Sequence, residues 1–148
     1  MAQHMAQQNA EGSRDLSTLV DASVELQYLV QTIWRLRQPD GCPWDREQTH
    51  QSIGKNMIEE AYEALDCIEA DDATHLREEL GDVLMQVVLH AQIAADAGEF
   101  TLADVARDID AKLIRRHPHV FGDVDADSSD EVLKIWDEVK LAERAAKD

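Results

Sequence analysis

The stretch Met57–Asp82 constrains this chain more than any other, because acidic residues recur there at helical spacing on both sides of a short break. Before the break, Glu60 and Glu63 flank a stripe of apolar residues. After it, Glu79 and Asp82 do the same. Residues three apart are neighbours on one helix surface. The break covers only residues 69–72, so the two helices should pack antiparallel as a hairpin.

Such a hairpin would gather the four acids at the edge of a shared apolar seam. Carboxylates at close range repel one another unless a cation lies between them. Ligand sets made only of oxygen suit hard ions. The sequence therefore predicts a divalent-metal site, with Mg²⁺ as cofactor and Mn²⁺ as a substitute, formed by Glu60, Glu63, Glu79 and Asp82. The alternative is a solvated acidic face, an interpretation that accounts well for Glu59 and Glu78.

The composition favours an all-helical protein, because Gly and Pro are sparse, at 6 and 3 of 148 residues. We expect residues 1–15 to be disordered and residues 16–148 to form a single all-α domain. The hydrophobic periodicity predicts a bundle of about five helices, over residues 16–37, 49–68, 73–97 and 101–117 and from residue 128 to a frayed tail that begins at Glu143. The third helix is apolar nearly all round, which favours a homodimer that completes the core. Burial by the first and fifth helices of the same chain is the alternative.

The net charge of −17 excludes attraction to a nucleic acid polymer or an anionic membrane through the overall field. No apolar run is long enough to cross a bilayer. Cys42 and Cys67 are not spaced as a zinc or redox motif. They are typical of reduced thiols, which predicts a cytoplasmic protein.

Basic and aromatic residues stand out against this acidic background. Lys112 and Arg116 lie one helical turn apart in the densest basic stretch, where they either complement a helix dipole or bind an anion. Trp136 and Lys140 have the same spacing. They are either a base-stacking wall with a phosphate contact or a core tryptophan beside a solvated lysine. Trp44, in a loop with two prolines, either plugs the core or forms a pocket wall.

An acidic metal site, a basic pair and aromatic walls together fit a nucleotide or another metal-chelated polyphosphate. Metal ions would neutralise the phosphates and lower the pKa of a bound water. Lys112, Arg116 and Lys140 would hold the distal phosphates and stabilise the leaving group. Glu59, next to the acidic quartet, would position or deprotonate the attacking water.

From about Leu29 to Arg144 the chain resembles the MazG family of nucleoside triphosphate pyrophosphohydrolases. The carboxylate signature is Glu59-Glu60-x-x-Glu63 followed by Glu79-x-x-Asp82. All-α dUTP pyrophosphatases and phosphoribosyl-ATP pyrophosphohydrolases share this signature. More specific to MazG are the loop at residues 41–45, which reads Gly-Cys-Pro-Trp-Asp, and the segment at residues 115–119, which reads Arg-Arg-His-Pro-His.

The resemblance implies an all-α NTP pyrophosphatase fold, a dimer or dimer of dimers, and Mg²⁺-dependent conversion of an NTP to the NMP and diphosphate. By position it implies metal ligands at Glu60, Glu63, Glu79 and Asp82, and nucleotide contacts at Lys112, Arg116, Trp136 and Lys140. Some members carry two tandem copies of the domain and this chain has one, which makes association of identical chains more necessary. We expect broad base specificity and a role in nucleotide-pool house-cleaning. A pyrophosphatase narrow for dUTP or dCTP and a non-catalytic nucleotide-binding dimer remain alternatives.

Overall fold

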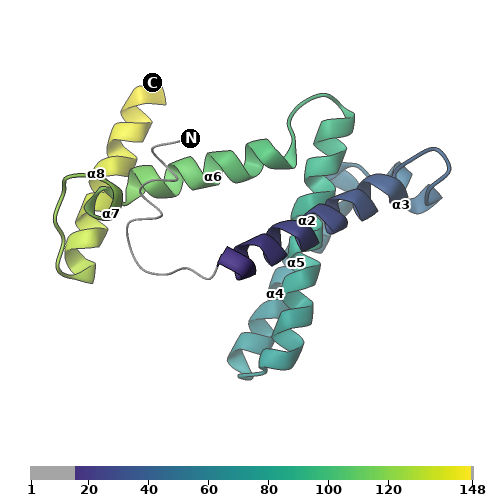
Figure 1. The fold of residues 1–148 in the computed structure, drawn as a ribbon, viewed down its shortest axis with the longest axis horizontal. Helices are drawn as coiled ribbons and strands as arrows, with labels where there is room; N and C mark the ends of the chain where they lie inside the picture. Colours follow the sequence, from purple (N-terminus) through teal and green to yellow (C-terminus); the bar gives the residue numbers. More distant parts are fainter. Residues whose placement is uncertain (1–15, 148) are drawn as a thin grey trace. The chain divides into compact units, whose positions relative to one another are not determined.

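The computed structural model describes residues 16–147, with side chains from Thr18 onward. The prediction for residues 1–15 lies outside this range. All regular structure in the described range is helical, which confirms the all-α prediction (Figure 1). The helices are α2 (Leu16–Leu36), α3 (Pro43–Glu47), α4 (His50–Glu69), α5 (Ala73–Asp96), α6 (Leu102–Arg116), α7 (Pro118–Phe121) and α8 (Ser129–Lys147). The five long helices are those that the periodicity predicts, and the short α3 and α7 lie in the expected loops.

The described residues form two compact units, residues 16–102 and residues 103–147. The first holds α2 to α5, and the second holds nearly all of α6 together with α7 and α8. The expectation of a single domain over residues 16–148 stays a prediction. No helix in residues 16–147 combines the length and the apolar character that a membrane span requires.

The α4–α5 hairpin is specified by local signals at each end. Thr49 caps α4, because its side chain accepts a hydrogen bond from the Ser52 amide while the Ser52 hydroxyl accepts one from the Thr49 amide. Asp71 then reverses the chain with a left-handed φ of 53°. Asp72 caps α5 by accepting from the His75 amide. So short a turn leaves α4 and α5 side by side in opposite directions (Figure 1).

The core of this unit lies where α2 packs on α5. Its buried side chains are Ile33, Ile53, Val88, Leu89 and Ile93. The side of α5 that carries Val88 and Leu89 is therefore covered within the same chain. Exposed leucines lie nearer the N-terminal end of α5, where Leu80 and Leu84 keep 52% and 43% of their surface exposed.

The predicted apolar seam of the hairpin is only partly correct. Met57 and Leu65 of α4 are exposed, although the periodicity assigns them to the seam. The least exposed line on α4 instead runs through Ile53, Glu60 and Ala64. Because α4 has apolar residues on more than one side, hydrophobic spacing alone does not fix which side faces α5. The acidic residue Glu60 therefore lies in the face of α4 that contacts α5, and not on the flank of that face.

In the second unit, α8 begins at a capping arrangement in which Ser128 Oγ accepts from the Glu131 amide and Glu131 accepts from the Asp127 amide. The predicted fraying from Glu143 is wrong for the described residues, because α8 continues to Lys147. No residue of α6 or α8 is buried, and the apolar side chains of Ile109 and Leu113 on α6 remain about half exposed.

Candidate active site

Four carboxylates converge on the α4–α5 hairpin. Helix α4 supplies Glu60 and Glu63, and α5 supplies Glu79 and Asp82. One oxygen atom from each carboxylate lies within 4.8 Å of the others. The spacing of three residues places each pair on one helix surface, and the tight turn brings the two surfaces together. The structure therefore assembles the whole predicted quartet.

Two of these carboxylates have an oxygen that is buried without a partner. Glu60 Oε2 and Glu79 Oε2 are inaccessible to solvent and accept no hydrogen bond from any residue the structure describes. A buried carboxylate oxygen without a donor is costly. All the ligand atoms that the four carboxylates offer are oxygens, which suits Mg²⁺ or Mn²⁺. The residues present therefore fit a hard divalent cation.

The raised pKa values of two carboxyls in the cluster also favour a bound divalent cation. Burial raises the pKa of Glu79 from its ordinary 4.5 to about 7, with further contributions from a hydrogen bond to Glu63 and from the negative charges of Glu63, Asp82 and Glu60. Burial is also the largest cause that raises the pKa of Glu60. The metal-free cluster thus holds a proton near neutral pH, and a dication would take its place.

Cys67 lies beside the cluster without joining it. Burial, followed by the charge of Glu79, raises the pKa of its thiol, so it stays protonated and is a poor metal ligand at neutral pH. Both Cys67 and Cys42 are free thiols. The cluster therefore keeps its all-oxygen character.

Two other predicted site residues of this unit lie outside the quartet. Glu59 is exposed, and its negative charge raises the pKa of Glu60 less than burial, Glu63 and Asp82 do. Trp44 follows Pro43, the first residue of α3, and is 56% exposed, so it does not plug the core. Arg37 anchors this segment by donating to the backbone oxygens of Asp45 and Gln48.

The basic and aromatic candidates belong to the second unit. Lys112 and Arg116 lie on α6, Trp136 and Lys140 lie on α8, and all four are partly buried. Trp136 packs edge-on against His117 with the ring centroids 5.3 Å apart, and its Nε1 has no partner within the described residues. Their contact with a nucleotide stays a prediction.

Sequence reasoning missed two features. Glu143 accepts hydrogen bonds from Arg115 Nε at 2.7 Å and Arg116 Nη2 at 3.0 Å. It follows Lys140 by three residues, a spacing that could have drawn attention to it. His50 and His90 stack with parallel rings, their Nδ1 atoms 2.8 Å apart. They come from different helices, so no local pattern signals their contact.

The hairpin with its four carboxylates makes this an all-α protein with a candidate site for a divalent cation. Comparison with known sequences identifies the family. Residues 48–121 match the MazG nucleotide pyrophosphohydrolase domain. The chain therefore belongs to the MazG family, which confirms the resemblance seen in its motifs. The matched range includes the acidic quartet, Lys112 and Arg116, and it excludes Trp44, Trp136 and Lys140.

Individual relatives agree with this assignment. The chain is 47% identical to the nucleoside triphosphate pyrophosphohydrolase/pyrophosphatase MazG of Thermotoga maritima, over 86% of this chain and 48% of that protein. It is 48% identical to the nucleoside triphosphate pyrophosphohydrolase of Escherichia coli, over 83% of this chain and 47% of that protein. The chain thus spans about half the length of these curated relatives.

A solved structure agrees at the level of the fold. The crystal structure of a mazG-related protein from Thermotoga maritima superposes with a TM-score of 0.65 at 28% sequence identity. The match covers 78% of this chain and 98% of that one. The all-α NTP pyrophosphatase type of fold is therefore shared.

Proposed function

We propose that this chain is a Mg²⁺-dependent nucleoside triphosphate pyrophosphohydrolase that converts an NTP and water to the NMP and diphosphate, with broad base specificity. The observation that carries the proposal is the carboxylate quartet, with its buried oxygens that lack a partner. The relatives from Thermotoga maritima and Escherichia coli, which are named nucleoside triphosphate pyrophosphohydrolases, support the reaction type.

In this proposal Glu60, Glu63, Glu79 and Asp82 hold Mg²⁺, with Mn²⁺ as a substitute. When bound, the ion supplies charge neutralisation at the phosphates and acidifies water. Glu59 positions or deprotonates the attacking water, a role that its exposure next to Glu60 permits.

The nucleotide contacts come from the sequence pattern. Lys112, Arg116 and Lys140 bind the phosphates in this proposal, because fixed cations stabilise charge that develops on a leaving diphosphate. Trp136 and Trp44 offer aromatic faces to the base. A face that stacks without reading hydrogen bonds discriminates little between bases, which is consistent with broad specificity.

The proposed assembly is a homodimer or a dimer of dimers. Helix α4 exposes Met57, Ile58, Tyr62 and Leu65 on one side, and α5 exposes Leu80 and Leu84. A second copy would remove these apolar surfaces from water. Sedimentation should give a dimer or larger species at micromolar concentration, and Tyr62→Glu should shift it toward the monomer. A native monomer under these conditions would exclude the assembly.

Free Cys42 and Cys67 fit a reducing compartment such as the cytoplasm.

The decisive experiment measures diphosphate released from ATP, GTP, dUTP and dCTP in Mg²⁺. We expect turnover of several of these substrates. Glu63→Gln should abolish metal-dependent turnover and leave the helical content unchanged. Glu78→Gln is the matched control, because Glu78 is an exposed neighbour on α5 outside the quartet. Undiminished turnover in Glu63→Gln would rule out its ligand role, and cleavage of dUTP or dCTP alone would replace broad specificity with the narrow alternative.

A further inference from the structure

Gln86 is the only polar residue that is buried in the part of the chain that the structure describes. It lies in the middle of α5 and keeps 3% of its surface exposed. Its side-chain oxygen Oε1 is inaccessible to solvent and accepts no hydrogen bond from any described residue. A buried amide oxygen without a donor is costly, so this atom requires a donor that the described residues do not supply.

The position of Gln86 on α5 places it between the carboxylate quartet and the apolar core. It follows Asp82 by four residues and Glu79 by seven, so the three residues share one face of α5. Leu89, one turn further along this face, belongs to the core. The side chains of a helix lean toward its N-terminus, so Gln86 covers the turn that carries Asp82. The amide therefore borders the quartet on its core side.

Unpartnered oxygens gather at this place in the hairpin. Glu60 Oε2 and Glu79 Oε2 are buried without a donor, as Gln86 Oε1 is. A divalent cation satisfies carboxylate oxygens by its charge, but it leaves the neutral amide oxygen in need of a hydrogen-bond donor unless it binds that oxygen directly. Mg²⁺ gives up its water reluctantly and usually keeps several water molecules when carboxylates bind it. Such a water can face the ion with its oxygen and donate a hydrogen to an amide oxygen.

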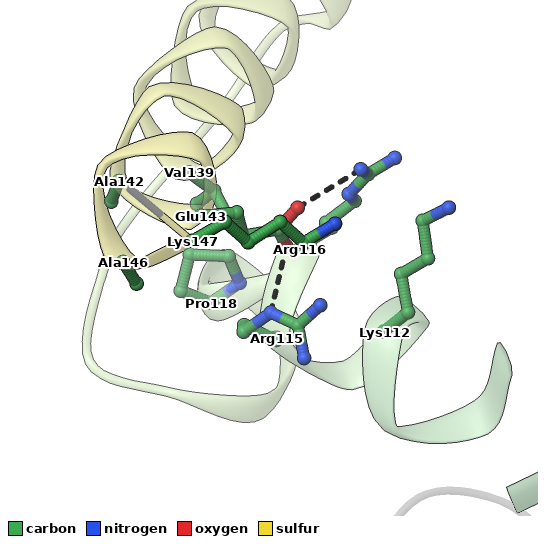
Figure 2. A pocket seen from close by; sticks show the side chains of 9 residues that line it. All are labelled: Lys112, Arg115, Arg116, Pro118, Val139, Ala142, Glu143, Ala146 and Lys147. Atoms are coloured by element: carbon green, nitrogen blue, oxygen red, sulfur yellow. Dashed lines mark hydrogen bonds and ion pairs between the residues drawn. The ribbon is translucent and has the colours of Figure 1, made fainter. Parts of the chain in front are cut away.

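A carboxylate of the second unit shows how the chain itself supplies donors where it can. Glu143 accepts hydrogen bonds from Arg115 and Arg116, as Figure 2 shows. Gln86 has no such donor among the described residues. A glutamine also suits its place better than a further acid would, because an amide oxygen accepts a hydrogen bond without adding negative charge to four carboxylates.

We propose that Gln86 is a positioning residue of the metal site, whose Oε1 accepts a hydrogen bond from a water molecule of the hydrated dication on the core side of the quartet. The inference rests on the proposed function for the identity of the ion, Mg²⁺. Gln86 is outside the ligands and the nucleotide contacts that the family resemblance implies. Contacts of this kind around a metal site typically change metal affinity by roughly 10–100-fold.

The test replaces Gln86 by methionine, which has a similar volume and no hydrogen-bonding amide. Calorimetric titration of Mg²⁺ into the full chain at pH 8, without nucleotide, should show about tenfold weaker binding in Gln86→Met than in the native protein. Gln92→Met is the matched control, because Gln92 lies on the same helix, pairs with Asp96 and is outside the quartet. Its Mg²⁺ affinity should equal that of the native protein.

Denaturant unfolding in EDTA separates this role from a purely structural one. Without metal, Gln86→Met should be as stable as the native protein or more stable, because the substitution removes an unpartnered polar atom from the interior and keeps its volume. Addition of Mg²⁺ should then stabilise the native protein more than Gln86→Met, because the native protein binds the ion more tightly. A variant that is both well folded and weaker in Mg²⁺ binding is the expected result.

Three results would overturn the proposal. Equal Mg²⁺ affinity in Gln86→Met and the native protein would make Gln86 a residue of the core alone. Lower stability of Gln86→Met in EDTA would show that Oε1 has a partner in the metal-free protein. A loss of Mg²⁺ affinity well above about a hundredfold would make Gln86 a direct ligand of the ion and not the acceptor for a water.

These measurements are independent of the hydrolysis assay. If the native chain cleaves none of the four triphosphates but Gln86→Met weakens Mg²⁺ binding as expected, the proposed function fails and the role of Gln86 stands. If the chain turns over triphosphates and Gln86→Met binds Mg²⁺ as the native protein does, the reverse holds. Where both stand, Gln86→Met should lose turnover at limiting Mg²⁺ and regain most of it at saturating Mg²⁺, and a loss that persists at saturation would contradict a role confined to holding the ion.

Discussion

Competition between Mg²⁺ and a proton should control metal affinity at the carboxylate quartet. Glu79 must lose its proton to act as a ligand, and its pKa is raised to about 7 by burial and by the neighbouring acids. Raising the pH from 6 to 8 therefore converts this carboxyl from mostly protonated to mostly ionised. Because Glu60 also has a raised pKa, its titration can only add to the effect in the same direction.

The magnitude follows from a single titration. With a pKa of about 7, about nine in ten Glu79 carboxyls are protonated at pH 6, half at pH 7 and about one in ten at pH 8. Mg²⁺ affinity should then rise about tenfold between pH 6 and pH 8. Binding should release nearly one proton per site at pH 6 and about a tenth of a proton at pH 8.

Calorimetric titration of Mg²⁺ in two buffers of different ionisation enthalpy measures both the affinity and the protons released. Glu79→Gln serves as the matched variant, because the amide of the glutamine does not titrate. This variant should bind Mg²⁺ more weakly than the native protein, and its Mg²⁺ affinity should lack the part of the pH dependence that Glu79 causes. If the native protein binds Mg²⁺ with the same affinity at pH 6 and pH 8 and releases no protons, the quartet does not bind the ion through Glu79.

Two further predictions concern stability. The arginines hold the folded pKa of Glu143 at about 2, below its ordinary 4.5, so its stabilising contribution is present above about pH 4.5 and is lost as the pH falls toward 2. Thermal unfolding between pH 5 and pH 2 should show a smaller loss in Glu143→Gln than in the native chain, and equal losses would contradict the pairing. Gly41→Ala should be strongly destabilising, because a Cβ there would lie 2.6 Å from the Arg35 carbonyl oxygen, whereas Gly54→Ala meets open space in α4 and should stabilise by about 0.5–1 kcal/mol. Denaturant unfolding of both variants measures the contrast, and a stable Gly41→Ala protein would refute the close approach.

The local sequence determined where the long helices begin and end and which acids share a surface. Thr49 and Asp72 cap α4 and α5 through bonds to residues three positions on, so the hairpin is already encoded within short segments. The spacing of Glu60 from Glu63 and of Glu79 from Asp82 is equally local. For that reason the quartet could be predicted before its geometry was known, and with it the family.

Only the tertiary structure decided which face of each helix turns inward. Helix α4 has apolar residues on several sides, and packing against α5 chose the side that carries Ile53 and Ala64. That choice buried an oxygen of Glu60 and raised its pKa, neither of which helical spacing specifies. The pairing of Glu143 with Arg115 spans 28 positions in the chain. Burial and contacts between distant segments depend on how all the helices pack together to remove apolar surface from water. A short stretch of sequence does not determine that packing.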